Sequence, residues 1–172
     1  MSEQITVERV QTMILRAPYH QWLGLKVNTI HDDGIELTAT WREEWVVSQE
    51  RRYTHGGVIA ALIDLAADWA MIKKLGRPIP TIDLRVDFHS PAMPGDLNCR
   101  GKIIKVGNQF SSSESFVFDN SGKLLASGRG TYFSAPLKAD ANENVLFSQS
   151  WAADSPGPRL VKDRNYRSGR QR

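Results

Sequence analysis

The stretch from residue 56 to about residue 75 constrains the fold most, because it is apolar nearly all the way round a helix. It reads GGVIAALIDLAADWAMIKKL. A helix on a protein surface needs only one apolar stripe, whereas this one must be covered on most of its sides. Gly76 and Pro78 follow in the order that ends a helix. The sequence therefore predicts a long, buried helix.

Strand-like segments lie on both sides of this helix. Apolar and polar residues alternate with period two over 23–28, 35–42 and 82–89, and 97–106, 110–118 and 124–133 also resemble strands. Four consecutive strands without a helix between them favour antiparallel pairing, and a helix between strand groups is typical of an α+β fold. We expect a sheet of about six strands around one central helix.

The two ends of the chain differ from this middle part in composition. Residues 5–16 predict a short amphipathic helix that Pro18 ends, so we assign 1–19 to an N-terminal helical segment. Residues 20–135 form one predicted domain, as 172 residues with 41% hydrophobic composition suit a single core. Residues 136–172 are rich in Ala, Asp, Ser, Gly and Arg and predict a basic, disordered tail.

Charge and cysteine content exclude several classes of function. The net charge of +3 comes entirely from the tail, and the neutral remainder does not favour a nucleic-acid partner. No apolar run reaches the roughly 18 residues that span a bilayer, and the start lacks a secretory segment, so we expect a cytoplasmic protein without a membrane partner. The single Cys99 excludes an internal disulfide, and the four histidines show no metal-ligand spacing.

The glycines at the start of the predicted helix are the first candidate for chemistry. His55, Gly56 and Gly57 follow one another there, so backbone amides would point outward at a positive helix terminus without a side chain in the way. Such amides can stabilise a developing oxyanion. The alternative is that the glycines only make a tight turn into the helix.

Asp64 is the second candidate, because it is a carboxylate among apolar neighbours. An unpaired buried carboxylate costs several kcal/mol, so Asp64 must find partners, change its pKa or face a wet cleft. It can then act as general base or nucleophile, or it can serve a structural role. Asp68 lies one turn further on the same face, where it shares a proton with Asp64 or, as we prefer, faces Lys73, Lys74 or solvent.

Three motifs in order resemble one known family. They are HGGVIAALIDLAADWA, TIDLRVDFHSPA with the following Gly95-Asp96, and GKLLASGRGTYF. Over residues 20 to 134 the chain resembles the hotdog-fold thioesterases of the phenylacetate-degradation (PaaI-like) type. The resemblance implies a curled antiparallel sheet around one long helix, with sites at a dimer interface. It further implies a homodimer that pairs into a homotetramer, with no cofactor beyond the coenzyme A of the substrate.

The resemblance also implies roles for single residues. Asp64 matches the catalytic carboxylate, and Gly56 matches the glycine whose amide polarises the thioester carbonyl. His55 either assists the departing thiolate or braces the turn, and Asp68 departs from the Ser or Thr of several relatives. The predicted set is catalytic Asp64, Gly56, His55 and Gln49, with Gly57, Thr81 and Asp68 in substrate binding.

Hydrolysis of an acyl-CoA thioester to a free acid and coenzyme A is the function that this set predicts. One alternative is a non-catalytic acyl-CoA binding or sensor module, whose basic tail contacts a partner. A hotdog dehydratase ranks last, because it needs a histidine paired with an acid in a differently spaced motif. No such pairing surrounds His31 or His89.

Overall fold

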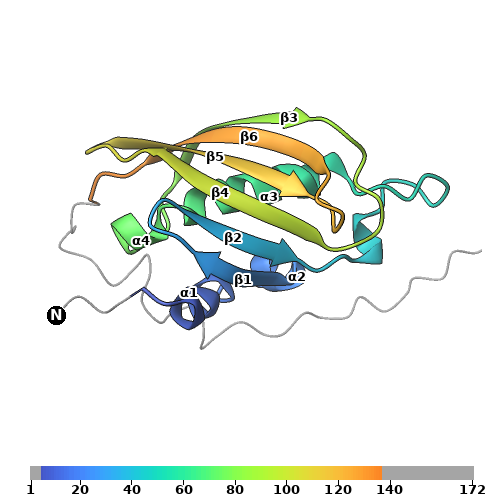
Figure 1. The fold of residues 1–172 in the computed structure, drawn as a ribbon, viewed down its shortest axis with the longest axis horizontal. Helices are drawn as coiled ribbons and strands as arrows, with labels where there is room; N and C mark the ends of the chain where they lie inside the picture. The colour runs from blue at the N-terminus through green and yellow to red at the C-terminus, as the bar shows by residue number, and fades with distance from the viewer. Residues whose placement is uncertain (1–4, 137–172) are drawn as a thin grey trace, which may run out of the picture. The chain divides into compact units, whose positions relative to one another are not determined.

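The computed structural model describes residues 5–136 and consists of one sheet, one long helix and several short helices (Figure 1). The predicted tail lies outside the described residues, apart from Pro136. In chain order the elements are α1 (Val7–Ile14), α2 (Pro18–Trp22), β1 (Leu25–Ile30), β2 (Gly34–Ala39), the 3-10 helix η1 (Glu43–Trp45), α3 (Gly56–Trp69), α4 (Ile72–Leu75), β3 (Thr81–Phe88), β4 (Leu97–Lys105), β5 (Phe110–Phe118) and β6 (Leu124–Phe133).

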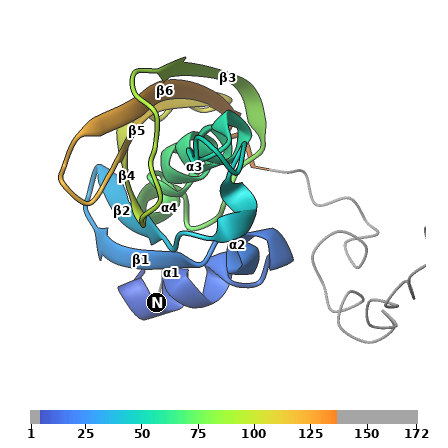
Figure 2. The same cartoon turned by 90° about the vertical axis from the view of Figure 1, so that its right-hand side faces the viewer.

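The six strands form one antiparallel sheet in the order β1-β2-β4-β5-β6-β3. The sheet curls around α3, as the view along the helix shows (Figure 2). β1 and β3 are the two edge strands. β2 and β3 are consecutive strands in the chain, but α3 lies between them and they are not neighbours in the sheet. The predicted α+β hotdog architecture is therefore confirmed.

The core lies between the inner face of this sheet and α3. Alternate residues of β1, β2 and β4 point inward and are buried, as period-two side chains on a half-covered sheet must be. The helix contributes seven buried residues to this core, namely Val58, Ile59, Leu62, Ile63, Ala66, Ala67 and Trp69. Their burial confirms that the helix is covered on most sides.

Small residues on the sheet bring α3 unusually close to it. A Cβ atom added at Gly101 would collide with the backbone carbonyl of Ala66, and one at Gly128 would collide with Ile63. Two buried serines of β5 donate hydrogen bonds to helix carbonyls: Ser113 to Ala67 at 2.6 Å and Ser115 to Ile63 at 2.7 Å. The inner face of the sheet thus fixes the position of the helix backbone.

Helix boundaries differ from the expectation in two places. α3 ends at Trp69, and a turn leads into the separate α4, which Gly76 caps in the left-handed conformation with φ 70°. Pro18 does not stop the helical segment but begins α2, because proline suits the first position of a helix.

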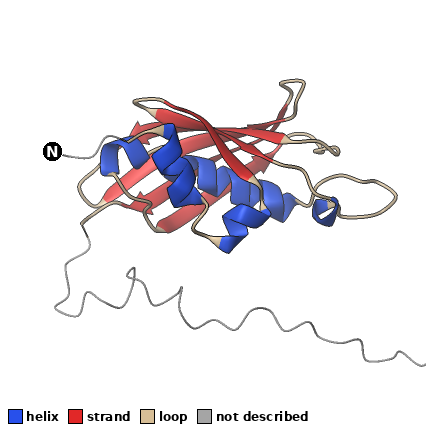
Figure 3. Ribbon diagram, turned by 90° about the horizontal axis from the view of Figure 1, so that it is seen from below, coloured by secondary structure: helices blue, strands red, loops and turns tan. Residues whose placement is uncertain are grey.

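The N-terminal helices lie against β1 at one edge of the sheet (Figure 2), and the view from below shows the helices in front of the strands (Figure 3). The side chain of Gln11 in α1 accepts from the Val27 amide at 2.7 Å and donates to the Leu25 carbonyl at 3.0 Å. It thereby pairs with backbone groups that an edge strand would otherwise leave open. None of the helices in residues 5–136 has the length and hydropathy to cross a membrane.

Candidate active site

The start of α3 is organised by His55, which caps the helix. Its Nδ1 accepts the Gly57 amide at 2.8 Å, so the neutral ring carries its proton on Nε2. The Gly57 amide is therefore engaged, which differs from the expectation that both glycine amides are open. The Gly56 amide has no acceptor among the described residues. The geometry makes His55 a brace of the turn and leaves Gly56 as the donor available to a ligand.

Asp64 lies on α3 eight residues after Gly56 and is half-buried. Its Oδ1 accepts the Thr81 hydroxyl at 3.0 Å and the Tyr132 hydroxyl at 3.2 Å. Within residues 5–136, Asp64 forms no ion pair, and its Oδ2 accepts no hydrogen bond. The carboxylate has found neutral partners on one oxygen and keeps the other open.

A β-bulge directs Thr81 toward Asp64. Thr81 pairs with Tyr132, and the next pair is Asp83 with Thr131, so Ile82 is an extra residue in β3. In a regular strand, side chains alternate between the two faces, and Thr81 would lie on the outer face with Asp83. The extra residue moves Thr81 to the inner face, where Leu84 also lies. The bulge turns the Thr81 hydroxyl inward and leaves Ile82 58% exposed.

Tyr132 is a site residue that the sequence interpretation missed. The side chain is fully buried, and its hydroxyl also lies 3.3 Å from the Asp64 carbonyl. Burial raises the pKa of Tyr132 far above its ordinary value, and the charges of Asp64 and Asp68 raise it further, so the phenol stays protonated. The sequence does contain one signal for it, the pattern Gly130-x-Tyr132. Residues two apart in a strand lie on the same face, so the glycine leaves room for the tyrosine ring beside it.

Asp68 faces the interior of the protein, so the expectation that it faces Lys73, Lys74 or solvent is wrong. Its Oδ1 accepts the Ile79 amide at 3.0 Å, while Lys73 pairs with Asp32 at 2.6 Å. Burial raises the pKa of Asp68 to about 7 against the opposing Ile79 hydrogen bond; the charge of Asp64 adds to the increase, and Arg77 opposes it. Asp68 therefore binds a proton at higher pH than an exposed aspartate does.

The predicted residues form two groups along α3. One group lies in the second half of the helix: Asp64 accepts a hydrogen bond from Thr81, and its charge raises the pKa of Asp68. The other group lies at the start of the helix and consists of His55, Gly56 and Gly57. Gln49 belongs to neither group, because it lies in the exposed loop between Val46 and Thr54 that projects from the molecule in Figure 1. A helix rises 1.5 Å per residue, so about 12 Å separate Gly56 from Asp64.

One stripe of α3 connects these two groups and is only partly covered by the rest of the described chain. The stripe consists of Gly57, Ala60, Ala61, Asp64 and Asp68, all of which are partly or fully accessible. β3 runs beside it. Thr81 is bonded to Asp64 at one end, and at the other end a Cβ atom added at Gly56 would lie 3.4 Å from the Phe88 ring. Phe88 is 57% exposed and Ile82 on the same strand is 58% exposed, so β3 presents two large apolar side chains to solvent.

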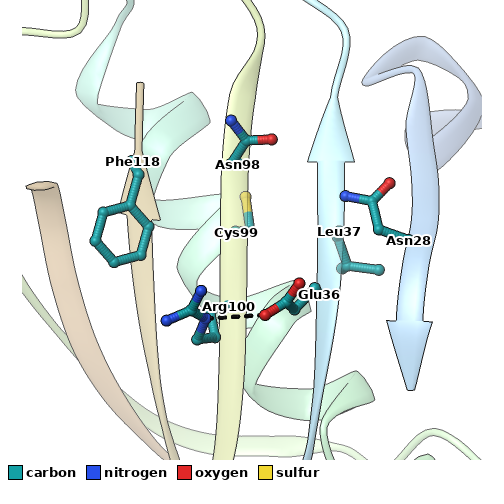
Figure 4. Close-up of a pocket in the computed structure, with 7 residues that line it drawn as sticks. All are labelled: Asn28, Glu36, Leu37, Asn98, Cys99, Arg100 and Phe118. Atoms are coloured by element: carbon teal, nitrogen blue, oxygen red, sulfur yellow. Dashed lines mark hydrogen bonds and ion pairs between the residues drawn. The ribbon is translucent and has the colours of Figure 1, made fainter. Parts of the chain in front are cut away.

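A hollow on the other face of the sheet contains none of these residues (Figure 4). It is lined by Asn28, Glu36, Asn98, Arg100 and Phe118, and there Arg100 pairs with Glu36 at 3.1 Å. Among the described residues, no group of three or more His, Cys, Asp or Glu side chains is arranged to hold a metal ion.

Comparison with known proteins identifies the family. The thioesterase superfamily model matches residues 52–126. A solved structure of a protein from the thioesterase superfamily is 42% identical, with a TM-score of 0.72, and the match covers 74% of this chain and 96% of that one. The chain belongs to the thioesterase superfamily. This confirms the resemblance at the family level and the expected enzyme class, a thioester hydrolase.

More distant members of the thioesterase superfamily agree with this assignment. The medium/long-chain acyl-CoA thioesterase YigI of Salmonella typhimurium is 23% identical over 153 residues, which are 77% of this chain and 98% of that protein. A thioesterase from Haemophilus influenzae shares the fold, with a TM-score of 0.67 at 21% identity over 76% of this chain and 91% of the other.

Proposed function

We propose that the protein hydrolyses acyl-CoA thioesters, with Asp64 as base or nucleophile and the Gly56 amide as oxyanion donor. The observation that carries this proposal is the state of Asp64. It is a half-buried carboxylate on a partly accessible stripe, it has no cationic partner among the described residues, and one oxygen is open. Because fully buried polar atoms normally have a partner, the free oxygen is one that water or a substrate can reach. The acyl-CoA activity of the YigI relatives supports the choice of substrate.

The proposed site needs two copies of the chain. A carbonyl bound at the Gly56 amide of one copy lies about 12 Å from Asp64 of the same copy, because eight residues of helix separate them. Two α3 helices that pair antiparallel through their open stripes would bring Gly56 of one copy opposite Asp64 of the other. The exposed Ile82 and Phe88 on the edge strand β3 support an apolar contact beside this pairing.

Several finer parts of the proposal rest on the family resemblance. These are the PaaI-like subtype, the pairing of dimers into a homotetramer and the cytoplasmic location. Gln49 and Gly57 remain predicted site residues. The exposed loop that carries Gln49 leads through Thr54 to His55, so it can reach a ligand bound at the helix start.

Thiol release from short, long and aromatic acyl-CoAs tests the proposal. The wild-type protein should turn over at least one of them, and Asp64→Asn should lower kcat by about 1,000-fold or more while the chain still folds, since the amide is neither basic nor nucleophilic. Undiminished turnover by Asp64→Asn contradicts the role of Asp64. Thermal stabilisation of the wild type by acyl-CoA without thiol release would favour the sensor alternative.

Oxygen labelling in a single turnover separates the two chemical routes. If Asp64 attacks the thioester, solvent oxygen enters the Asp64 carboxylate when the acyl-enzyme is hydrolysed. If Asp64 acts as a base, solvent oxygen enters only the free acid.

A further inference from the structure

We propose that Tyr132 is a positioning residue for this reaction. Together with Thr81 it holds Oδ1 of Asp64, so that Oδ2 is the oxygen that takes a proton from water or attacks the thioester. The inference rests on the proposed function and adds to it a residue and the identity of the reacting atom.

The hydrogen bonds to Asp64 divide its two oxygens. Oδ1 accepts from Thr81 at 3.0 Å and from Tyr132 at 3.2 Å, and Oδ2 accepts from no described residue. Rotation of the carboxylate would break both bonds to Oδ1, and bonds to a charged oxygen are stronger than those between neutral groups. The two hydroxyls therefore fix the plane of the carboxylate and leave Oδ2 as the oxygen that is free to react.

The two donors reach this oxygen from neighbouring strands. Thr81 and Tyr132 are directly paired residues of β3 and β6, so both side chains leave the same face of the sheet at the same level. Gly130 makes room for the longer side chain, because a Cβ atom there would collide with the Tyr132 hydroxyl and ring. A tyrosine can lie along the strand toward Asp64 only because this position is glycine.

Tyr132 also fixes the helix backbone beneath the carboxylate. Its hydroxyl lies 3.3 Å from the Asp64 carbonyl, so the same group contacts the main chain and the side chain of one residue. Since the phenol stays protonated, it can donate throughout the working pH range. Ser115 supports the same helix at the Ile63 carbonyl but touches no part of the carboxylate.

Either chemical route uses the free oxygen in a balanced step. In the base route, Oδ2 takes a proton from water, the resulting hydroxide bonds to the carbonyl carbon, the C–S bond breaks, and the departing thiolate takes the proton from Oδ2. In the nucleophile route, Oδ2 bonds to the carbonyl carbon and the thiolate departs. Water then cleaves the anhydride, which gives the free acid and restores the carboxylate, and the remaining proton of that water goes to the thiolate.

Tyr132→Phe tests the inference, because it removes only the hydroxyl. With an acyl-CoA that the wild type hydrolyses, kcat should fall about tenfold while KM stays nearly constant, since the hydroxyl orients the catalytic group and not the substrate. Thr81→Val should have a similar effect. The double variant should lose more than the product of the two single losses, because either hydroxyl alone still restrains the carboxylate.

Ser115→Ala is the matched control. It removes another buried hydroxyl that bonds the same helix from the same sheet, so it should lower the melting temperature but keep kcat. The inference is overturned if Tyr132→Phe retains the wild-type kcat, or if Ser115→Ala lowers kcat equally. Should Tyr132→Phe fail to fold, the exposed Thr81→Val decides, and its retention of kcat overturns the inference. If the wild type hydrolyses no acyl-CoA at all, the proposed function itself fails and the inference with it.

Discussion

The two faces of α3 differ in how their residues are used. The face toward the sheet is packed at the closest distance that the backbone allows, with glycines at 101 and 128 and serine hydroxyls bonded to the Ile63 and Ala67 carbonyls. The other face carries small residues and two carboxylates and is only partly covered by the described chain. The packed face therefore fixes the position of the helix, and in the proposed site the other face supplies the groups that meet the ligand and the second copy.

This difference explains how an aspartate is tolerated in so apolar a helix. On the packed face an unpaired carboxylate would lose its hydration without compensation. On the open face Asp64 keeps one oxygen accessible. The hydroxyls of Thr81 and Tyr132 take the place of water at the other oxygen. The close packing of α3 against the sheet holds Asp64 at a fixed distance from these two hydroxyls.

After the loss of Asp64 itself, the largest effect should come from removing the Gly56 amide at the start of the helix. Gly56→Pro deletes the N–H at the first helical position, where proline is tolerated, and the extended His55 backbone, with φ −59° and ψ 133°, suits a following proline. We expect kcat for acyl-CoA to fall about 100- to 1,000-fold, as for loss of one oxyanion donor.

Gly56→Ala is the control for this variant, because it also adds side-chain atoms but keeps the amide. The added Cβ atom would lie 3.4 Å from the Phe88 ring, which is an ordinary van der Waals contact. It should retain most of the activity. Equal kcat values for the alanine and proline variants would show that the amide is not the oxyanion donor.

A glycine on the packed side should affect stability and not chemistry. Gly101→Ala forces its Cβ atom into the Ala66 carbonyl, so the helix must move away from the sheet. Unfolding in urea should show a loss of about 3 kcal/mol, the upper part of the range for overpacked cores. The same Gly→Ala change at Gly56 should leave the free energy of unfolding nearly unaltered; equal losses at both positions would refute the contrast between the faces.

A smaller effect should appear as a pH dependence of Asp68. Because its folded-state pKa is raised to about 7 from 3.8, the folded protein binds this proton more tightly than the unfolded chain. The stability of the wild type should therefore fall, relative to Asp68→Asn, as the pH rises from about 4 to about 7, and stay level above that. We expect a difference of roughly 2 to 4 kcal/mol between the ends of this window.

Urea unfolding of both proteins at several pH values measures this difference. Asparagine keeps an oxygen for the Ile79 amide, so the comparison isolates the charge. A stability difference that does not change with pH would show that Asp68 is ionised throughout.

The sequence supported the architecture and part of the site. Period-two segments on both sides of one apolar helix were sufficient to predict the antiparallel sheet, and the isolated carboxylate at Asp64 and the glycines after His55 indicated where chemistry would lie. It could not indicate Tyr132, which is 68 residues from Asp64 and meets it only because β6 pairs with β3. Nor could it indicate the bulge at Ile82, since a regular alternation predicts Thr81 on the wrong face.

Local patterns thus determined the helix, the strands and the presence of an acid in an apolar setting, because these depend on residues close together in the chain. The tertiary structure decided which oxygen of Asp64 is held, which glycine amide is open and how far burial raises the pKa of Asp68. Those properties depend on hydroxyls, amides and charges that strand pairing brings together from distant parts of the chain.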